Sequence, residues 1–136
     1  MIEANHTGTH LLHQALRNIL GDHVEQRGSM ISDEMFRFDF SHPSKLSSSD
    51  LHSINSFVNS KIKESIPLVE NREEDYETAI NNGAIGLFTE KYEDKVRTVK
   101  FNESYELCGG THAKNTSKLK TFSTVSYTHL RAHETK

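Results

Sequence analysis

Two short motifs near opposite ends of the chain constrain its fold more than any other feature. The first, NHTGTH, carries His6 and His10, and the second, CGGTH, carries Cys108 and His112. Three imidazole nitrogens and one thiolate suit zinc in a tetrahedral site. If the four side chains hold one ion, the fold must bring the N-terminal segment against a turn that lies far along the chain.

Spacing alone is modest evidence for such a site. The chain has nine histidines, so chance predicts about 0.6 pairs with this spacing. His129 and His133 form a second such pair. The Cys-to-His spacing has roughly a 1-in-15 chance of arising from composition alone. Each half also has an ordinary interpretation, because the first pair could lie at a solvated helix start and Cys108 could be a small buried apolar residue.

The composition bounds the class of protein. A chain of 136 residues suits one domain with one modest core, and no apolar run is long enough to cross a bilayer. No basic-then-apolar leader follows Met1, so secretion is not predicted. A lone cysteine favours a metal ligand or nucleophile in a reducing, cytoplasmic compartment. The net charge of -3 argues against a dedicated nucleic-acid binder, but permits a domain that touches only a nucleic-acid end.

Hydrophobic spacing predicts a first helix that carries the histidine pair. We expect it to be capped at Asn5 or Thr7 and to stop at Gly21. His6 and His10, one turn apart, then share one face. The apolar positions behind this prediction are Leu12, Ala15, Leu16 and Ile19.

Two further helices are expected. One follows a capping box of Ser47 and Asp50 and is ended by Pro67. The other is a short acidic helix over residues 72–83 with a solvated face. The apolar stripe of the longer helix consists of Leu51, Ile54, Phe57, Val58 and Ile62.

Alternating residues predict the strands. Residues 36–40 alternate aromatic side chains with Arg37 and Asp39, after a turn at Ser32–Glu34, so we expect a hairpin with the aromatic face in the core. Residues 95–101 form another strand, and residues 67–71 a short one. Without a βαβ rhythm the class is α+β, with an antiparallel sheet packed against helices and a zinc site between the first helix and a Cys-Gly-Gly turn. The alternating apolar positions are Phe36, Phe38, Phe40, Val96, Thr98 or Val99, and Phe101.

Three longer stretches resemble one family in its own order. They read NHTGTHLLHQALRNILGDHVEQRGSMISDEMFRFDFSH, GAIGLFTEKYEDKVRTV and ESYELCGGTH. Together they resemble the editing domain of alanyl-tRNA synthetase and its free-standing relatives, from Asn5 to about Thr124. The resemblance implies an α+β domain that hydrolyses alanine-specific tRNA wrongly loaded with serine or glycine. The partners it implies are the acceptor end of that tRNA and the remainder of a cytoplasmic synthetase.

The resemblance also implies the site residues. Zinc is the implied cofactor, and its implied ligands are His6, His10, Cys108 and His112. The implied amino-acid pocket contains Thr9, Gln26 and Ser29. Thr9 and Gln26 can bind a serine hydroxyl, so that alanine would leave polar groups unpaired.

The catalytic group is not identified by the sequence. Four protein ligands close a zinc site, as in structural sites, whereas a catalytic zinc keeps a position open. His13 is a candidate base, although a histidine one turn past a ligand is more often a supporting or solvent-facing residue. Backbone N–H groups of Gly109 and Gly110 could stabilise an oxyanion. Lys91 and Lys95 could touch tRNA phosphate, although isolated lysines are usually only surface residues.

The last residues depart from the family pattern. Where another strand is expected, the chain reads SYTHLRAHETK, and residues 125–135 back-translate into the adaptor sequence used in DNA library preparation. We therefore expect residues 1–124 to be an editing-domain fragment that lacks its C-terminal strand region, and residues 125–136 to be a non-native tail. That tail would contain His129 and His133. Met1 would then be an internal methionine.

Three alternatives stay open. The editing domain of threonyl-tRNA synthetase shares the metal spacing, but CGGTH and RFDFSH favour the alanine branch. A free-standing trans-editing protein would have the same domain, and only flanking gene sequence separates it from a synthetase. A zinc-stabilised tRNA-binding module without catalysis is the alternative from another class, and deacylation of seryl-tRNA separates it from an enzyme.

Overall fold

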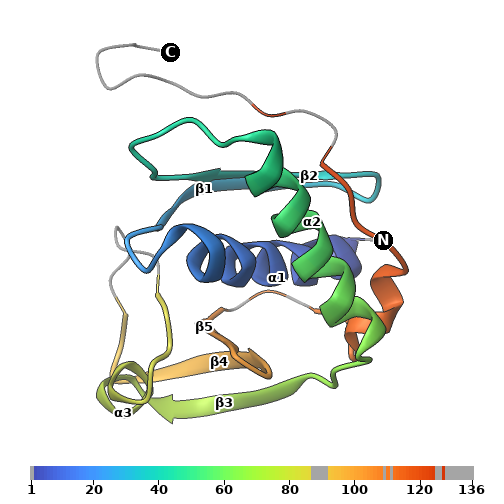
Figure 1. The fold of residues 1–136 in the computed structure, drawn as a ribbon. Helices are drawn as coiled ribbons and strands as arrows, with labels where there is room; N and C mark the ends of the chain where they lie inside the picture. The colour runs from blue at the N-terminus through green and yellow to red at the C-terminus, as the bar shows by residue number, and fades with distance from the viewer. Residues whose placement is uncertain (1, 87–91, 109, 111, 125–126, 128–136) are drawn as a thin grey trace.

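The computed structural model describes residues 2–86, 92–108, 110, 112–124 and 127, and Figure 1 shows them in three layers. A hairpin forms one outer layer, two crossing helices form the middle, and a three-stranded antiparallel sheet forms the other outer layer. This arrangement confirms the expected α+β class. The elements are α1 (Ile2–Leu20), β1 (Gln26–Ile31), β2 (Phe36–Phe40), α2 (Ser48–Lys63), β3 (Val69–Asp75), α3 (Tyr76–Asn81), β4 (Lys95–Phe101), β5 (Ser104–Leu107) and the 3-10 turn η1 (Thr116–Leu119).

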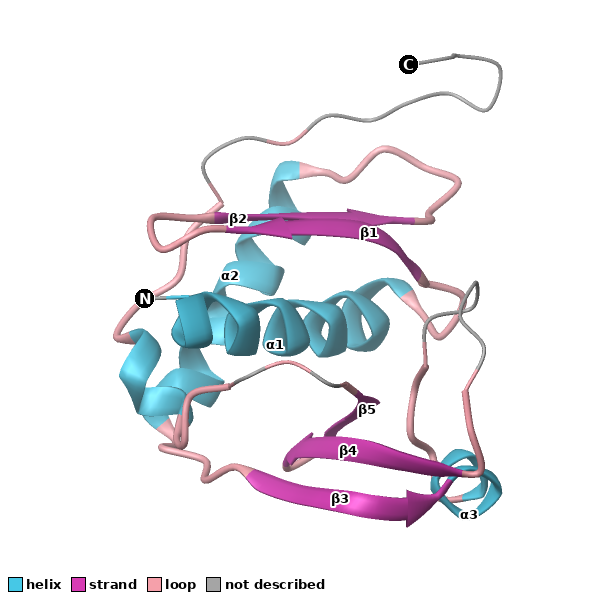
Figure 2. Ribbon diagram, turned by 180° about the vertical axis from the view of Figure 1, so that it is seen from behind, coloured by secondary structure: helices cyan, strands magenta, loops and turns pink. Residues whose placement is uncertain are grey.

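Helix α1 lies between the hairpin and the three-stranded sheet, as the view from behind in Figure 2 also shows. It begins at Ile2, so the predicted start at Asn5 or Thr7 is wrong. Both side chains make tertiary hydrogen bonds instead of caps: Asn5 Nδ2 donates to the carbonyl of Ser32 at 2.6 Å, and Thr7 Oγ1 accepts from the N–H of Ala113 at 2.9 Å. The predicted stop is confirmed, because Gly21 ends the helix with a φ of 130°.

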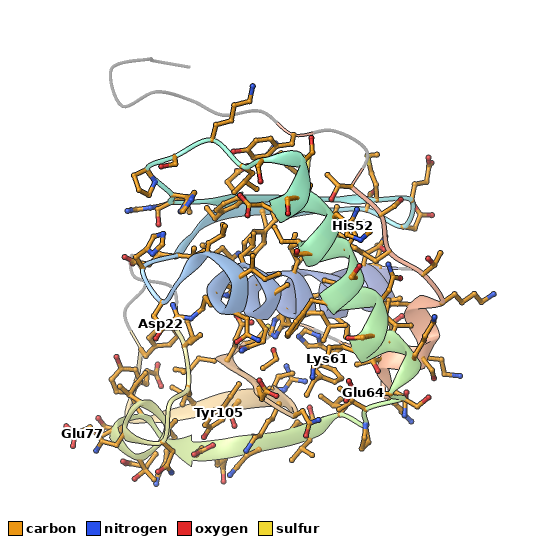
Figure 3. All side chains as sticks on the ribbon, viewed as in Figure 1. Asp22, His52, Lys61, Glu64, Glu77 and Tyr105 are labelled. Atoms are coloured by element: carbon orange, nitrogen blue, oxygen red, sulfur yellow. The ribbon has the colours of Figure 1, made fainter. Side chains whose placement is uncertain are left out.

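The main core lies where α1, α2 and β4 meet, and Figure 3 shows side chains filling the space between the helices and the sheet. The capping box of Ser47 and Asp50 at the start of α2 is confirmed. Each large side chain buried here contributes about 1.5–3 kcal/mol of hydrophobic stabilisation. The buried core residues of these elements are Leu11, Ala15, Leu16, Ile54, Val58, Ile62, Val99 and Phe101.

The hairpin approaches α1 closely, and its turn lies where the sequence predicts it. Ser32 closes the turn by donating its N–H to the carbonyl of Met35 at 2.9 Å. A Cβ on Gly8 would lie 2.9 Å from Cε2 of Phe36, so the absence of a side chain lets β2 pack against α1. Arg37 and Asp39 pair on the exposed face at 3.2 Å, as expected.

The predicted acidic helix over residues 72–83 is wrong in its first part and confirmed in its second. Its first part, up to Asp75, continues β3, and only Tyr76–Asn81 is helical. The reason is pairing with β4, in which Asp75 lies opposite Lys95. Glu74 accepts hydrogen bonds from the hydroxyls of Thr98 at 2.8 Å and Tyr105 at 2.6 Å. These contacts come from residues far along the chain, and they outweigh local helix propensity.

The inner face of the three-stranded sheet turns toward α1. In the ladder Val99 lies opposite Glu70 on β3 and opposite Glu106 on β5, so these side chains share that face. Arg97, two residues before Val99, faces the same way. The sequence pattern did not predict β5, and with it the inward direction of Glu106.

Two further expectations concern membrane-spanning segments and the end of the chain. In the part of the chain that the structure describes, no helix is long and apolar enough to cross a membrane. Tyr127, which falls in the predicted tail, accepts a hydrogen bond from the N–H of Leu46 at 3.2 Å. The other residues of the tail, His129 and His133 among them, lie outside the described residues.

Candidate functional site

The four predicted ligand residues come together between α1 and the loop after β5. Their ligand atoms all lie within 4.8 Å of one another. Cys108 Sγ is 3.4 Å from Nε2 of His6 and 3.4 Å from Nε2 of His112. Ligands of a tetrahedral zinc lie about 3.5 Å apart, given Zn–S and Zn–N bonds of about 2.3 and 2.0–2.1 Å. The spacing of these atoms therefore fits one metal ion. We call the four residues the His/Cys cluster: His6, His10, Cys108 and His112.

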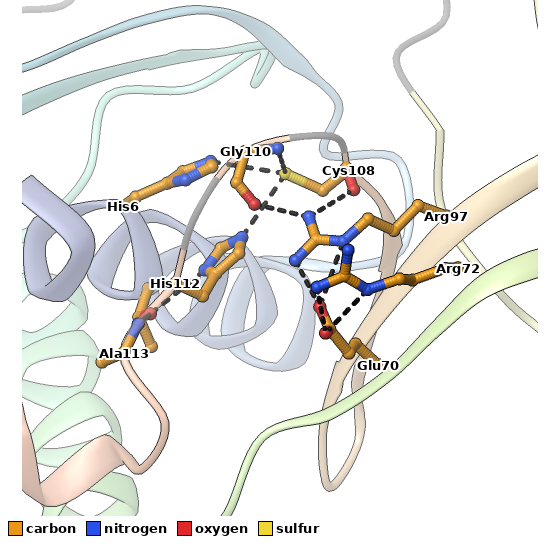
Figure 4. A network of polar contacts seen from close by, with 9 residues as sticks. His6, Glu70, Arg72, Arg97, Cys108, Gly110, His112 and Ala113 are labelled. Atoms are coloured by element: carbon orange, nitrogen blue, oxygen red, sulfur yellow. Dashed lines mark hydrogen bonds and ion pairs between the residues drawn. The ribbon is translucent and has the colours of Figure 1, made fainter.

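Local structure orients the ligand side chains on α1 and on the loop after β5 toward one another. On α1 the spacing of His6 and His10 places both rings on one face. Gly110 lets the loop approach, because a Cβ there would lie 2.2 Å from Cε1 of His6. Figure 4 shows Cys108 and Gly110 beside the rings of His6 and His112. The N–H of Gly110 donates to Cys108 Sγ at 3.4 Å. This hydrogen bond occupies the N–H group that we expected to stabilise an oxyanion. Gly109, the other expected donor, lies outside the described residues.

The second ring nitrogens of two cluster histidines lie near polar side chains, although within the described residues Nδ1 of His10 makes no hydrogen bond. Nδ1 of His112 lies 3.1 Å from Thr7 Oγ1, and Nδ1 of His10 lies 3.4 Å from a carboxylate oxygen of Glu106. A hydrogen bond such as that between His112 and Thr7 fixes the ring of a metal-bound histidine. Burial lowers the pKa of His10 below its ordinary value and lowers the pKa of His112 to about 2. Both rings are therefore neutral at neutral pH, which is the form that binds metals.

Glu106 is the functional residue that the sequence analysis missed. It is buried, and its two carboxylate oxygens lie 3.4 Å from Nδ1 of His10 and 3.4 Å from Nδ1 of His13. Burial works to raise its pKa, but the electrostatic attraction that a protonated His10 ring would exert and the hydrogen bond from His13 outweigh burial and leave the pKa below its ordinary value. One signal could have found it: Glu106 precedes Cys108 by two positions, so on a strand both face the same way.

A cavity of about 180 Å³ adjoins the cluster. Thr9, Gln26 and Ser29, the three predicted pocket residues, all line it. The structure thus brings the predicted pocket and most of the predicted metal ligands to one place. The other lining residues are His6, His10, His13, Ile85, Gly86, Glu106, Leu107 and Cys108.

A β-bulge puts two of the pocket residues on the same side of the hairpin. In a regular strand, Gln26 and Ser29 would face opposite sides because they are an odd number of residues apart. The register shifts between Gln26 and Gly28, so Gln26 lies opposite Phe40 and Ser29 opposite Phe38. Gln26 Nε2 donates to Ser29 Oγ at 3.3 Å.

Thr9 and His13 are two polar residues of α1 that line the cavity and differ in their hydrogen bonds. The hydroxyl of Thr9 donates to the carbonyl of His6 at 2.7 Å, which leaves its oxygen lone pairs able to accept. His13 is 2% exposed, so the solvent-facing alternative is wrong. Among the described residues, Nε2 of His13 has no hydrogen-bond partner.

The two lysines named as possible tRNA contacts give no support to that role. Lys95 is exposed at the start of β4 and does not belong to the described lining of the cavity. Lys91 lies outside the described residues. The structure therefore gathers the predicted ligands and pocket residues, and leaves the predicted tRNA-contact lysine Lys95 apart from them.

Comparison with known proteins identifies relatives. Residues 96–132, which include Cys108 and His112, match a family described as the threonyl and alanyl tRNA synthetase second additional domain. An alanine–tRNA ligase of Christiangramia forsetii is 56% identical over 116 residues, which cover 85% of this chain and 13% of the relative. Those of Thermoanaerobacter sp. (strain X514) and Thermotoga maritima are 53% and 50% identical over 123 residues, covering 90% of this chain and 14% of each relative.

Proposed function

We propose, from the premise that this chain is homologous to one segment of the alanine–tRNA ligases, that it hydrolyses wrongly loaded alanine-specific tRNA. The substrates would be seryl and glycyl esters at the acceptor end, and the partners would be that tRNA and the remainder of a synthetase chain. One observation carries the proposal. The pocket residues Thr9, Gln26 and Ser29 line the same cavity as three members of the His/Cys cluster.

The size of the cavity supports a small substrate group. The cavity volume is about 180 Å³. Pockets for drug-sized ligands are larger, at about 300–1,000 Å³. The cavity suits the amino-acid end of a charged tRNA, with the rest of the nucleic acid outside it.

Polar groups in the cavity support the choice of serine over alanine. Because the hydroxyl proton of Thr9 is given to the carbonyl of His6, the oxygen of Thr9 is free to accept the serine hydroxyl. The side-chain amide of Gln26 offers both a donor and an acceptor. An alanyl group would leave such groups unpaired, which is the discrimination that a polar pocket makes well. Glycine is proposed as a substrate from the family resemblance alone.

Zinc is the metal that we assign to the His/Cys cluster. Three nitrogens and one sulfur suit zinc, and four protein ligands complete a tetrahedral site of the structural kind. A bound zinc would supply positive charge there and tie α1 to the loop after β5. The protein itself would bind the amino acid and hold water: His13 lines the cavity, and Glu106 fixes its ring through Nδ1.

The alternative is a zinc-stabilised tRNA-binding module without catalysis, which is also consistent with a closed set of four ligands. One experiment separates this module from the enzyme. The purified chain is mixed with alanine-specific tRNA carrying serine, glycine or alanine, and ester loss is followed against the uncatalysed rate. We expect faster loss of serine and glycine, with alanine spared as the internal control. A folded, zinc-containing chain that binds the tRNA but leaves the seryl ester at the background rate would establish the module. The flanking gene sequence then separates a synthetase from a free-standing trans-editing protein.

A further inference from the structure

We propose that Arg97 is a positioning residue for the metal centre, because it binds the backbone of Cys108 and of Gly110 and thereby presents Cys108 to the three histidines. This inference rests on the metal site of the proposed function. It does not rest on the deacylase activity. Arg97 lies on β4, outside both motifs, and it does not belong to the described lining of the cavity.

The guanidinium of Arg97 binds the loop through two backbone carbonyls. Nη1 donates to the carbonyl of Cys108 at 3.0 Å and to the carbonyl of Gly110 (Figure 4). The backbone of Arg97 adds a third contact, because its carbonyl accepts from the N–H of Cys108 at 3.1 Å. The backbone of Cys108 and that of Gly110 are thereby held to β4.

Glu70 on β3 fixes Arg97 in turn. Nε of Arg97 donates to Oε2 of Glu70 at 3.1 Å, and Nη2 donates to the same oxygen. The hydrogen bond from Arg97 holds the pKa of Glu70 below its ordinary value, so the carboxylate is charged at neutral pH. Arg72 binds the other oxygen at 3.1 Å. The side chain of Arg72 is 78% exposed whereas that of Arg97 is 21% exposed, and among the described contacts Arg97 alone of the two binds Cys108 and Gly110.

The loop needs this support because metal binding tolerates little displacement. Ligand distances in a metal site are held within about 0.2 Å. Gly110 already lies so close to His6 that a Cβ would overlap its ring, so a shifted loop would either collide with His6 or withdraw the sulfur. Arginine suits the task because its planar fork reaches several acceptors at once, which a lysine ammonium does not. Partners of this kind commonly change metal affinity by about 10–100-fold.

Three variants of the full chain test the proposal: Arg97→Gln, Arg97→Lys and the matched control Arg72→Gln. The control removes the same charge beside the same carboxylate but no contact with the loop. Zinc affinity is measured by competition with a chelator, and ligand geometry by the absorption spectrum of the cobalt-substituted protein. We expect Arg97→Gln to weaken zinc binding about 10–100-fold and to alter the cobalt spectrum. Arg97→Lys should lose less, and Arg72→Gln should match the wild type.

A folded Arg97→Gln chain with wild-type zinc affinity and cobalt spectrum would overturn the proposal, as would an equal loss in Arg72→Gln. If circular dichroism shows that Arg97→Gln does not fold, the test uses Arg97→Lys and Glu70→Gln instead. Wild-type zinc affinity in both of these variants would overturn the proposal. A wild-type chain that binds no zinc would refute the metal centre and this inference with it. A chain that binds zinc in this manner but does not hydrolyse seryl-tRNA would refute only the deacylase function.

Discussion

Nε2 of His6 and Sγ of Cys108 lie 3.4 Å apart, although 102 positions separate the two residues in the chain. This contact joins α1 to the loop that follows the last strand of the three-stranded sheet. A metal held there would link α1 to that loop, and its binding free energy would add to folding stability because the unfolded chain has no such site.

Removal of the thiolate tests the metal directly. We expect Cys108→Ala to lower zinc content sharply from one ion per chain, as measured by elemental analysis of the folded protein. Gly110→Ala should do the same without removing a ligand, because its Cβ would displace the ring of His6. His52→Ala is the control, since His52 is exposed on α2 (Figure 3). Unchanged zinc stoichiometry in Cys108→Ala would refute the ligand assignment.

Gln26 should matter for substrate and not for metal. Loss of one hydrogen bond to a neutral group costs about 0.5–1.5 kcal/mol, and up to about 3 kcal/mol when a buried partner is stranded. In single-turnover hydrolysis of seryl-tRNA, Gln26→Ala should therefore be slower by a few-fold to about a hundredfold. Zinc content and the thermal unfolding midpoint should stay at the wild-type values. A wild-type rate would remove Gln26 from the pocket.

Thr9 should distinguish serine from glycine. Thr9→Val keeps the shape of the side chain and removes the oxygen that would accept the serine hydroxyl, while Thr9→Ser retains that oxygen and is the control. We expect Thr9→Val to slow hydrolysis of seryl-tRNA more than of glycyl-tRNA, by a few-fold for one lost hydrogen bond. Equal losses for the two esters would show that Thr9 does not read the hydroxyl.

Acid should destabilise the metal-free protein. The pKa values of His10 and His112 are lowered in the folded state, so both rings stay neutral while the unfolded chain takes up protons as the pH falls through about 6.5. Stability is then full above that pH and falls below it, by at most about 1.4 kcal/mol per pH unit for each ring. Urea unfolding of the chelator-treated chain at several pH values measures this slope. His112→Gln should reduce it, and an identical slope in that variant would contradict the assignment.

Much of the local structure follows from the sequence because its causes are local. The periodicity of α1 places His6 and His10 together, whatever the rest of the fold does. The turn after β1 and the capping box of α2 depend on side chains that bond to backbone only a few residues away. The residue types at the candidate site were likewise evident from the two motifs and the family resemblance.

Only the tertiary structure decided which other residues join that site. The predicted strand over residues 95–101 includes Arg97 as a polar position, but β5 and its Glu106 were not predicted, and the pairing of β3, β4 and β5 turns both side chains toward α1. The bulge beside Gly28 turns Gln26 to the side of Ser29, against the regular alternation of a strand. In each case the direction of a side chain is set by hydrogen bonds to a neighbouring strand, and those bonds depend on residues elsewhere in the chain that no local pattern specifies.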